Sequence, residues 1–125
     1  PRISRALRED GHDVFDDWYA VGPYADDYWK LYEEERGRSL TEALRGHAAQ
    51  HVYQFDRQHL DRVDAGLLVL PAGKSCHMEL GYVVGRGKRG YVLLPPDDLE
   101  RWDVMYAFTD GIYDSLDSLR DGLSA

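Results

Sequence analysis

The stretch VLPAGKSCHMELGYVVGRGKRGYVLL, from Val69 to Leu94, decides the fold class. It opens in an apolar run over Gly66–Leu70, passes through a glycine-containing turn, and closes in a second apolar run over Arg89–Leu94. Continuous apolar runs of this length are typical of strands buried on both faces of a parallel sheet. The intervening Ser75–Val84 has the length and spacing of a helix. The stretch therefore predicts a strand–helix–strand unit.

Around this unit the chain reads mainly as helices. A strand is predicted over Gly11–Phe15, ending in Asp16-Asp17-Trp18. Ser39 is a good helix cap and Glu42 completes a capping box, while Asp56 is expected to cap a later helix. The predicted helices are Arg2–Glu9, Asp26–Arg36, Leu40–Ala49, Asp56–Val63, Glu100–Phe108 and Tyr113–Leu119.

This order of elements argues for one α/β domain over residues 1–125, a three-layer sandwich with a parallel sheet of the flavodoxin-like or Rossmann-like kind. Such folds normally open with a strand, whereas this chain opens with the helix that should follow it. The first strand is therefore expected either to lie upstream of residue 1 or to be lacking from the sheet.

Composition and charge exclude several classes of function. The 125 residues carry a formal net charge of −8, and no run of basic residues offsets it, so polynucleotide binding is not expected. No apolar run approaches the roughly 20 residues of a membrane span, and no signal peptide is visible. The single cysteine, Cys76, excludes an intramolecular disulfide and fits a reducing, cytoplasmic compartment.

Gly73-Lys74-Ser75 looks like half of a phosphate-binding loop. A Walker A loop needs a glycine five residues before its Gly-Lys-Ser, and that position here is Leu68, inside the predicted strand. The turn is also too short to wrap round a triphosphate. What remains is a short turn that enters a helix, with Ser75 as the presumed cap and free amide groups facing the carboxyl end of the sheet.

Glu79 stands out as one acidic residue among apolar neighbours of the predicted helix. It lies four residues after Ser75, on the same side, and Met78, Leu80 and Tyr82 surround it in sequence. Two interpretations stay open: a carboxylate aimed at a ligand, or an ordinary surface carboxylate.

The spaced elements resemble the nucleoside 2-deoxyribosyltransferase family, including its nucleoside-monophosphate N-glycosidase relatives. The resemblance covers roughly residues 11–119 and is strongest between Tyr53 and Leu94. The matching residues are Gly11–Asp16, Asp56, Asp64, Leu67–Leu70, Gly73-Lys74-Ser75, Glu79-Leu80-Gly81 and Gly87-Lys88.

The resemblance implies an enzyme that acts on nucleosides or nucleoside monophosphates without a cofactor or metal. It places the nucleophile at Glu79 and the partner carboxylate at Asp56, with a substrate contact or a structural role for Asp64. Gly73 and Ser75 are expected either to bind phosphate or sugar or to form an ordinary helix start. From their place at the end of a predicted strand, Asp17 and Trp18 are expected either to meet the base or to pack in the core. It also implies a homodimer or higher homo-oligomer.

One departure supports a different function. Classical members of that family place an acidic or seryl residue six positions before the glutamate, where this chain has Gly73. A non-catalytic nucleotide-binding or sensing domain is therefore the alternative, and a structural or oligomerisation module is a third.

Two further candidate sites are weak. His47 and His51 have the spacing of a zinc pair, but no third ligand lies nearby. Cys76 lacks a partner histidine that would make it a nucleophile.

His77 is expected to be packed or solvated, and Trp102 with Met105 to line either a base pocket or a dimer interface.

Overall fold

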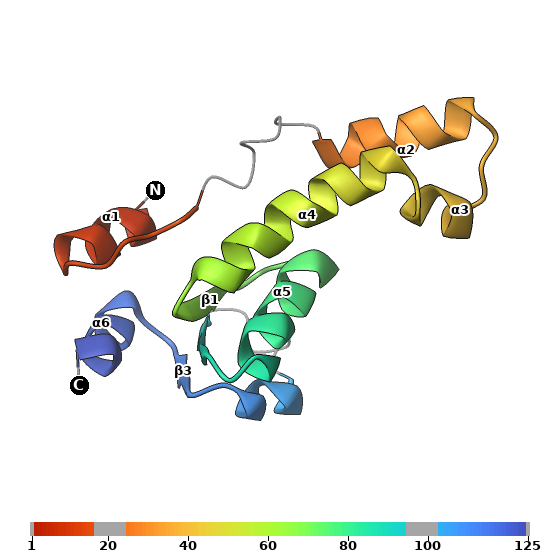
Figure 1. Ribbon diagram of the computed structural model, residues 1–125. Coiled ribbons are helices and arrows are strands. Elements are labelled where there is room, and N and C mark those ends of the chain that lie inside the picture. Colours follow the sequence, from red (N-terminus) through yellow and green to blue (C-terminus); the bar gives the residue numbers. More distant parts are fainter. Residues whose placement is uncertain (1, 17–24, 95–102, 125) are drawn as a thin grey trace. The chain divides into compact units, whose positions relative to one another are not determined.

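The computed structural model describes residues 2–16, 25–94 and 103–124 (Figure 1). The chain divides into two compact units. The first combines Pro1–Val14 with Val63–Ala125, and the second is Phe15–Arg62.

A parallel sheet forms the centre of the first unit. Its strands are β1 (Ala65–Val69), β2 (Arg89–Leu93) and β3 (Gly111–Tyr113), hydrogen-bonded in the order β1-β2-β3. Both pairings are parallel, and α5 (Lys74–Gly85) connects the first two strands. The strand–helix–strand prediction is therefore confirmed, and the described residues form a mixed α/β structure with an open, all-parallel sheet.

Helices cover both faces of this sheet. Leu67 and Leu68 are neighbours in β1, and because side chains alternate along a strand they enter different clusters. One cluster lies under α5 and the 3₁₀ helix η2 (Val104–Phe108), and consists of Leu68, Leu70, Leu80, Val92, Leu94 and Tyr106. The other lies under α1 (Arg2–Glu9) and α6 (Leu116–Ser124), with Leu7, Tyr91, Leu93 and Leu119 at its centre. This arrangement is compatible with an α/β sandwich.

Glycines flank α5 at both ends and fix where the helix begins and stops. Gly73, and not Ser75 as predicted, is the N-cap residue, in extended conformation and without a side-chain hydrogen bond. At the other end, Gly87 has φ +81° and its N–H donates to the Val84 carbonyl. Only glycine adopts that left-handed conformation readily, so Gly87 ends the helix.

The described part of the second unit contains the helices α2 (Ala25–Glu35), α3 (Leu40–Leu44) and α4 (His47–Arg62). The capping box is confirmed, because the Ser39 hydroxyl accepts from the Glu42 N–H and the Glu42 carboxylate accepts from the Ser39 N–H.

Two helix boundaries predicted in this unit are wrong. The helix from Leu40 ends at Leu44 and not Ala49, because the chain turns at Arg45-Gly46. Asp56 caps no helix and lies inside α4. One continuous helix needs only one nucleation step, and an interior aspartate costs it only about 0.7 kcal/mol.

The strand predicted from Gly11 to Asp16 is also wrong within the described residues. Gly11 has φ +93°, and the His12 N–H donates back to the Leu7 carbonyl. The Val14 carbonyl accepts from the Arg8 guanidinium at 2.9 Å. These bonds fold the segment back onto α1, so its backbone pairs with no strand here. Asp17 and Trp18 lie outside the described residues.

The C-terminal predictions need a further correction. The segment predicted as one helix from Tyr113 contains the end of β3, whose register pairs Gly111 with Tyr91 and Tyr113 with Leu93. The helix begins later, where the Ser115 hydroxyl accepts from the Ser118 N–H. A strand of three residues leaves too short an apolar pattern to be recognised in the sequence. Of the predicted helix from Glu100, the described part is η2.

Candidate functional site

The turn between β1 and α5 lies at the carboxyl end of the sheet, where open parallel sheets bind their ligands. Gly73 begins α5 without a side-chain cap, and Lys74 and Ser75 follow in its first turn, both exposed. No acidic residue occupies that turn. The first turn of α5 itself therefore supplies no carboxylate to the positive end of the helix dipole. The binding roles of Gly73 and Ser75 stay predictions.

Glu79 lies in the second turn of α5 and is half-buried. Its charge acts on Cys76, one turn earlier on the helix: desolvation by burial raises the pKa of the Cys76 thiol, and the Glu79 carboxylate raises it further. Cys76 is exposed at the surface, yet it is held as a neutral thiol. A thiolate nucleophile is thus disfavoured at Cys76.

The other predicted site residues divide between the two units. Asp56 is half-buried in α4 of the second unit, next in sequence to Phe55. Asp64 is exposed in the connection between α4 and β1. Since Asp56 and Glu79 belong to different units, the pairing of their carboxylates stays a prediction. The roles of Asp17 and Trp18 also stay predictions.

An aromatic cluster adjoins Asp56 on α4. The ring of Phe15 stacks on His59 with centroids 3.8 Å apart, and Phe55 meets His59 edge-on at 4.7 Å. These contacts partly bury Phe55 and His59 on α4, which the sequence pattern of the segment did not reveal.

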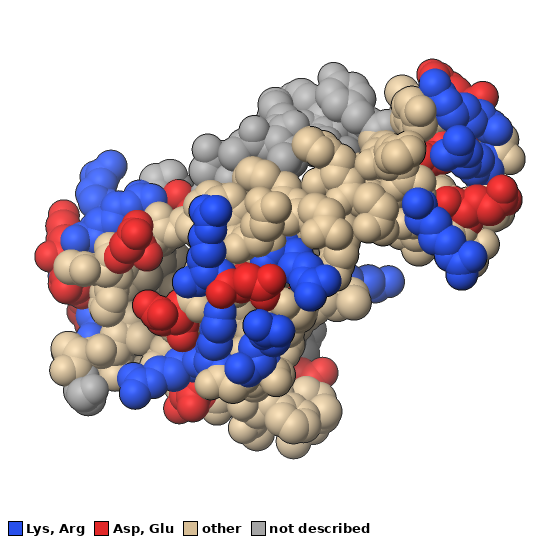
Figure 2. Space-filling view, in the orientation of Figure 1, with Lys and Arg blue, Asp and Glu red and all other residues tan. Residues whose placement is uncertain are grey.

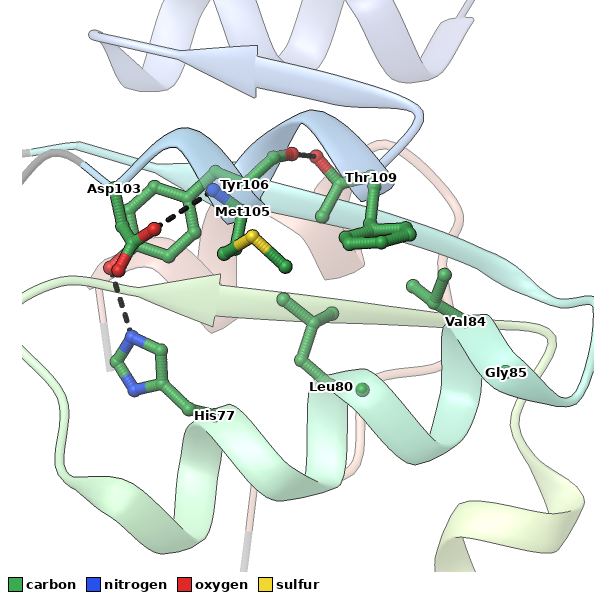
Figure 3. Close-up of a pocket in the computed structure, with 10 residues that line it drawn as sticks. His77, Leu80, Val84, Gly85, Asp103, Met105, Tyr106 and Thr109 are labelled. Atoms are coloured by element: carbon green, nitrogen blue, oxygen red, sulfur yellow. Dashed lines mark hydrogen bonds between the residues drawn. The ribbon is translucent and has the colours of Figure 1, made fainter.

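A cavity of about 450 Å³ lies on another flank of α5, between that helix and η2 (Figure 3). Its wall is almost entirely apolar, and Glu79 is not part of it. The lining residues from α5 are His77, Leu80, Gly81, Val84 and Gly85, and those from the η2 segment are Asp103, Met105, Tyr106, Phe108 and Thr109.

His77 and Tyr106 join the two walls of this cavity. The ring Nδ1 of His77 lies 2.8 Å from the Gly73 carbonyl oxygen, and Nε2 lies 2.9 Å from the Tyr106 hydroxyl. Because a carbonyl only accepts, the neutral ring carries its proton on Nδ1 and accepts the Tyr106 O–H at Nε2. The sequence predicted a packed or solvated His77, and the hydrogen bond to Tyr106 adds a specific partner 29 residues away.

The face of the molecule seen in Figure 2 has no patch of a single charge sign. The described residues also contain no candidate metal site. Figure 2 shows lysine and arginine side chains interspersed with aspartate and glutamate. Across residues 2–16, 25–94 and 103–124, no group of three or more His, Cys, Asp or Glu side chains could hold a metal ion. Within the same ranges, no helix is both long and apolar enough to cross a membrane.

Comparison with models of known protein families and with curated proteins finds no match to this chain. The resemblance to the deoxyribosyltransferases consequently depends on the motifs between Gly11 and Lys88.

Proposed function

We propose that this protein cleaves or exchanges the N-glycosidic bond of a nucleoside or nucleoside monophosphate, with Glu79 as nucleophile. The supporting observation is the position of Glu79: a half-buried carboxylate in the second turn of a helix that starts at the carboxyl end of a parallel strand. The proposal includes membership of the nucleoside 2-deoxyribosyltransferase family and a flavodoxin-like sheet.

The reaction that we propose has two steps. A Glu79 carboxylate oxygen attacks C1′, and the glycosidic bond breaks with its electron pair on the base nitrogen. Asp56 gives its proton to that nitrogen. In the second step water attacks C1′, returns a proton to Asp56 and releases the Glu79 carboxylate; a second base in place of water gives transfer. By analogy with retaining glycosidases, the two carboxyl groups must approach to roughly 5 Å.

The remaining site residues have binding roles in this proposal. The uncapped amides at Gly73 and the hydroxyl of Ser75 face an anionic or hydroxylated group of the substrate. Asp64 contacts the sugar, and Asp17 and Trp18 hold the base.

A nucleoside and nucleotide panel tests the proposal. Wild-type protein is expected to release free base, Glu79→Gln to fall to the uncatalysed rate, and Asp56→Asn to lose roughly 10²-fold or more. Asp121→Asn removes an exposed carboxylate from α6 and serves as the matched control, expected to retain full activity. Intact-mass analysis after an acid quench should show a sugar adduct that peptide mapping assigns to Glu79. Equal release by wild type and Glu79→Gln excludes the assigned role.

The second candidate is a nucleotide-binding domain without turnover. Gly73 favours it, because this position carries an acidic or seryl side chain in the family that the chain resembles, whereas here the cap makes no side-chain hydrogen bond. Isothermal calorimetry against the same panel distinguishes the two functions. Tight binding with unchanged ligand after long incubation supports the binding domain, and accumulating free base supports the enzyme.

A further inference from the structure

Each ring nitrogen of His77 has a partner, and the two partners lie on different elements. Nδ1 lies 2.8 Å from the carbonyl oxygen of Gly73, the N-cap residue of α5. Nε2 lies 2.9 Å from the hydroxyl of Tyr106, and Figure 3 shows the ring reaching from α5 toward η2. His77 thus ties the first residue of α5 to a neighbouring element.

Tyr106 is a firm anchor for this ring. Its side chain is buried in the core cluster under α5 and η2. The chain after η2 is fastened to the sheet, because the Asp110 N–H donates to the Gly90 carbonyl at 2.8 Å and the Gly90 N–H donates to the Asp110 carboxylate at 2.9 Å. Gly90 belongs to β2. The sheet therefore holds η2, and η2 holds the His77 ring.

The ring bond fixes the start of α5, where Gly73 has no side-chain cap. The Gly73 carbonyl also accepts the backbone N–H of His77, but at 3.3 Å, longer than the 2.8 Å to the ring. A trans peptide is planar, and its C=O and N–H point in opposite directions. With the Gly73 carbonyl held toward His77, the Lys74 N–H points out of the helix start, at the carboxyl end of the sheet.

We propose that His77 is a positioning residue, which together with Tyr106 orients the Gly73–Lys74 peptide toward the substrate. The inference rests on the proposed function and adds to it a residue that does not touch the substrate. The effect is confined to the first turn, because Leu80 is buried further along α5 and holds the body of the helix without His77. Loss of His77 should therefore weaken substrate binding while the chemical step at Glu79 keeps its rate.

The tautomer of His77 tests the hydrogen-bonded chain without any substrate. Because a carbonyl only accepts, the neutral ring must carry its proton on Nδ1, whereas a free histidine side chain favours the proton on Nε2. Long-range proton–nitrogen correlation spectra at about pH 8, where histidine side chains are ordinarily neutral, should show the Nδ1–H form. Tyr106→Phe should shift the ring toward the Nε2–H form, and His77→Asn identifies its signals by removing them. An Nε2–H ring in wild type overturns the inference.

Two amide substitutions separate the two bonds of the ring. His77→Asn places an amide nitrogen where Nδ1 lies and still donates to Gly73, whereas His77→Gln places its amide near Nε2 and reaches only Tyr106. With the nucleoside and nucleotide panel, His77→Ala and His77→Gln should raise KM about tenfold and keep kcat within about twofold, and His77→Asn should keep both within about twofold. His51→Asn, at an exposed histidine on α4, is the matched control and should behave as wild type.

The outcomes distinguish this inference from the proposed function. If wild type is active, an unchanged KM in His77→Ala, a loss of kcat alone, or equal losses in His77→Ala and His77→Asn overturns the positioning role and leaves the function standing. If wild type binds without turnover, the calorimetric Kd replaces KM in the same comparison. A wild type that neither converts nor binds any member of the panel overturns the proposed function, and the role of His77 falls with it. Circular dichroism confirms that each variant is folded.

Discussion

Gly90 occupies a position in β2 that leaves no room for a side chain. A Cβ there would lie 2.4 Å from Val84 Cγ2 and 3.2 Å from Leu80 Cδ1, both on α5. The branched Val84 side chain has one strongly preferred rotamer in a helix and does not turn away easily. The glycine therefore sets how closely α5 packs on the sheet.

We expect Gly90→Ala to lower the free energy of unfolding by about 1–3 kcal/mol, as overpacking of a core does. Gly66 is the natural control, because it pairs with Gly90 in the sheet register and its added Cβ would meet Leu80 and Val83 atoms at 3.4 Å, an ordinary contact. Urea denaturation should show Gly66→Ala within about 0.5 kcal/mol of wild type. Equal losses in both variants would contradict this account of the packing.

The titration of Cys76 reports on the direction of the Glu79 side chain. Burial and the Glu79 charge both hold the pKa of the thiol above its usual range. Glu79→Gln removes the negative charge, so the pKa should fall and alkylation by iodoacetamide near pH 8 should become faster, because the thiolate is the reacting form. Glu34→Gln on α2 should leave the rate unchanged. An unaltered thiol pKa in Glu79→Gln would mean that the carboxylate points away from Cys76.

At the scale of elements, a buried ion pair organises the second unit. The Glu33 side chain on α2 is only 2% exposed, and its carboxylate lies 3.0 Å from the Arg38 guanidinium just before α3. A Cβ at Gly46, in the turn before α4, would lie 2.6 Å from a Glu33 oxygen. The pair thus fills the space between α2 and the turns that flank α3.

Arg38→Met should destabilise the second unit by roughly 1–3 kcal/mol, because it leaves a buried carboxylate without its charged partner. This is less than for a fully buried pair, since the Arg38 side chain is itself 40% exposed. Arg45→Met, at an exposed arginine after α3, should be nearly neutral. Chemical denaturation followed by tryptophan fluorescence measures both; a neutral Arg38→Met would show that Glu33 finds sufficient hydrogen bonds elsewhere.

At the scale of the whole molecule, an ion pair links the two ends of the chain. Arg120 on α6 donates to both carboxylate oxygens of Asp10, after α1, at 2.6 and 2.8 Å. The Arg120 side-chain hydrogen bonds hold the pKa of Asp10 below its usual range. A folded-state pKa below the unfolded value means stability that is present above the unfolded pKa and lost as the pH falls through the folded pKa.

The stability difference between wild type and Asp10→Asn should therefore be largest near neutral pH and shrink on acidification below about pH 4. Urea midpoints measured from pH 7 to pH 3 give this difference. Asp117→Asn, on the same helix α6, is the matched control, because the interaction of Arg120 with Asp117 is through charge, whereas its side-chain hydrogen bonds go to Asp10. A stability difference that does not change with pH would show that the Asp10–Arg120 pair makes no pH-dependent contribution to stability.

The two units should also differ in local stability. Among the described residues the buried apolar side chains of the second unit are Ala43 and Ala49, whereas the first unit holds the larger ones, including Leu68, Val92 and Leu119. Hydrogen exchange should be slowest in β2, the central strand, and faster in α2 and α3. Equal protection of β2 and α3 would contradict a division into two units of unequal stability.

What sequence alone determined is local and periodic. The apolar runs gave β1 and β2, the Ser39–Glu42 pair gave its capping box, and Arg2–Glu9 gave α1 with its observed bounds. These features depend on residues near one another in the chain, where spacing and propensity act directly.

Only the tertiary structure decided β3, the conformation after Gly11, and the contacts between α5 and η2. β3 exists because three residues find Tyr91–Leu93 beside them, and the predicted strand after Gly11 fails because its backbone bonds to α1 instead. The α5–η2 cavity and the His77–Tyr106 bond join residues far apart in sequence. A strand needs a neighbour and a cavity needs two walls, and neither partner can be recognised from one segment of chain.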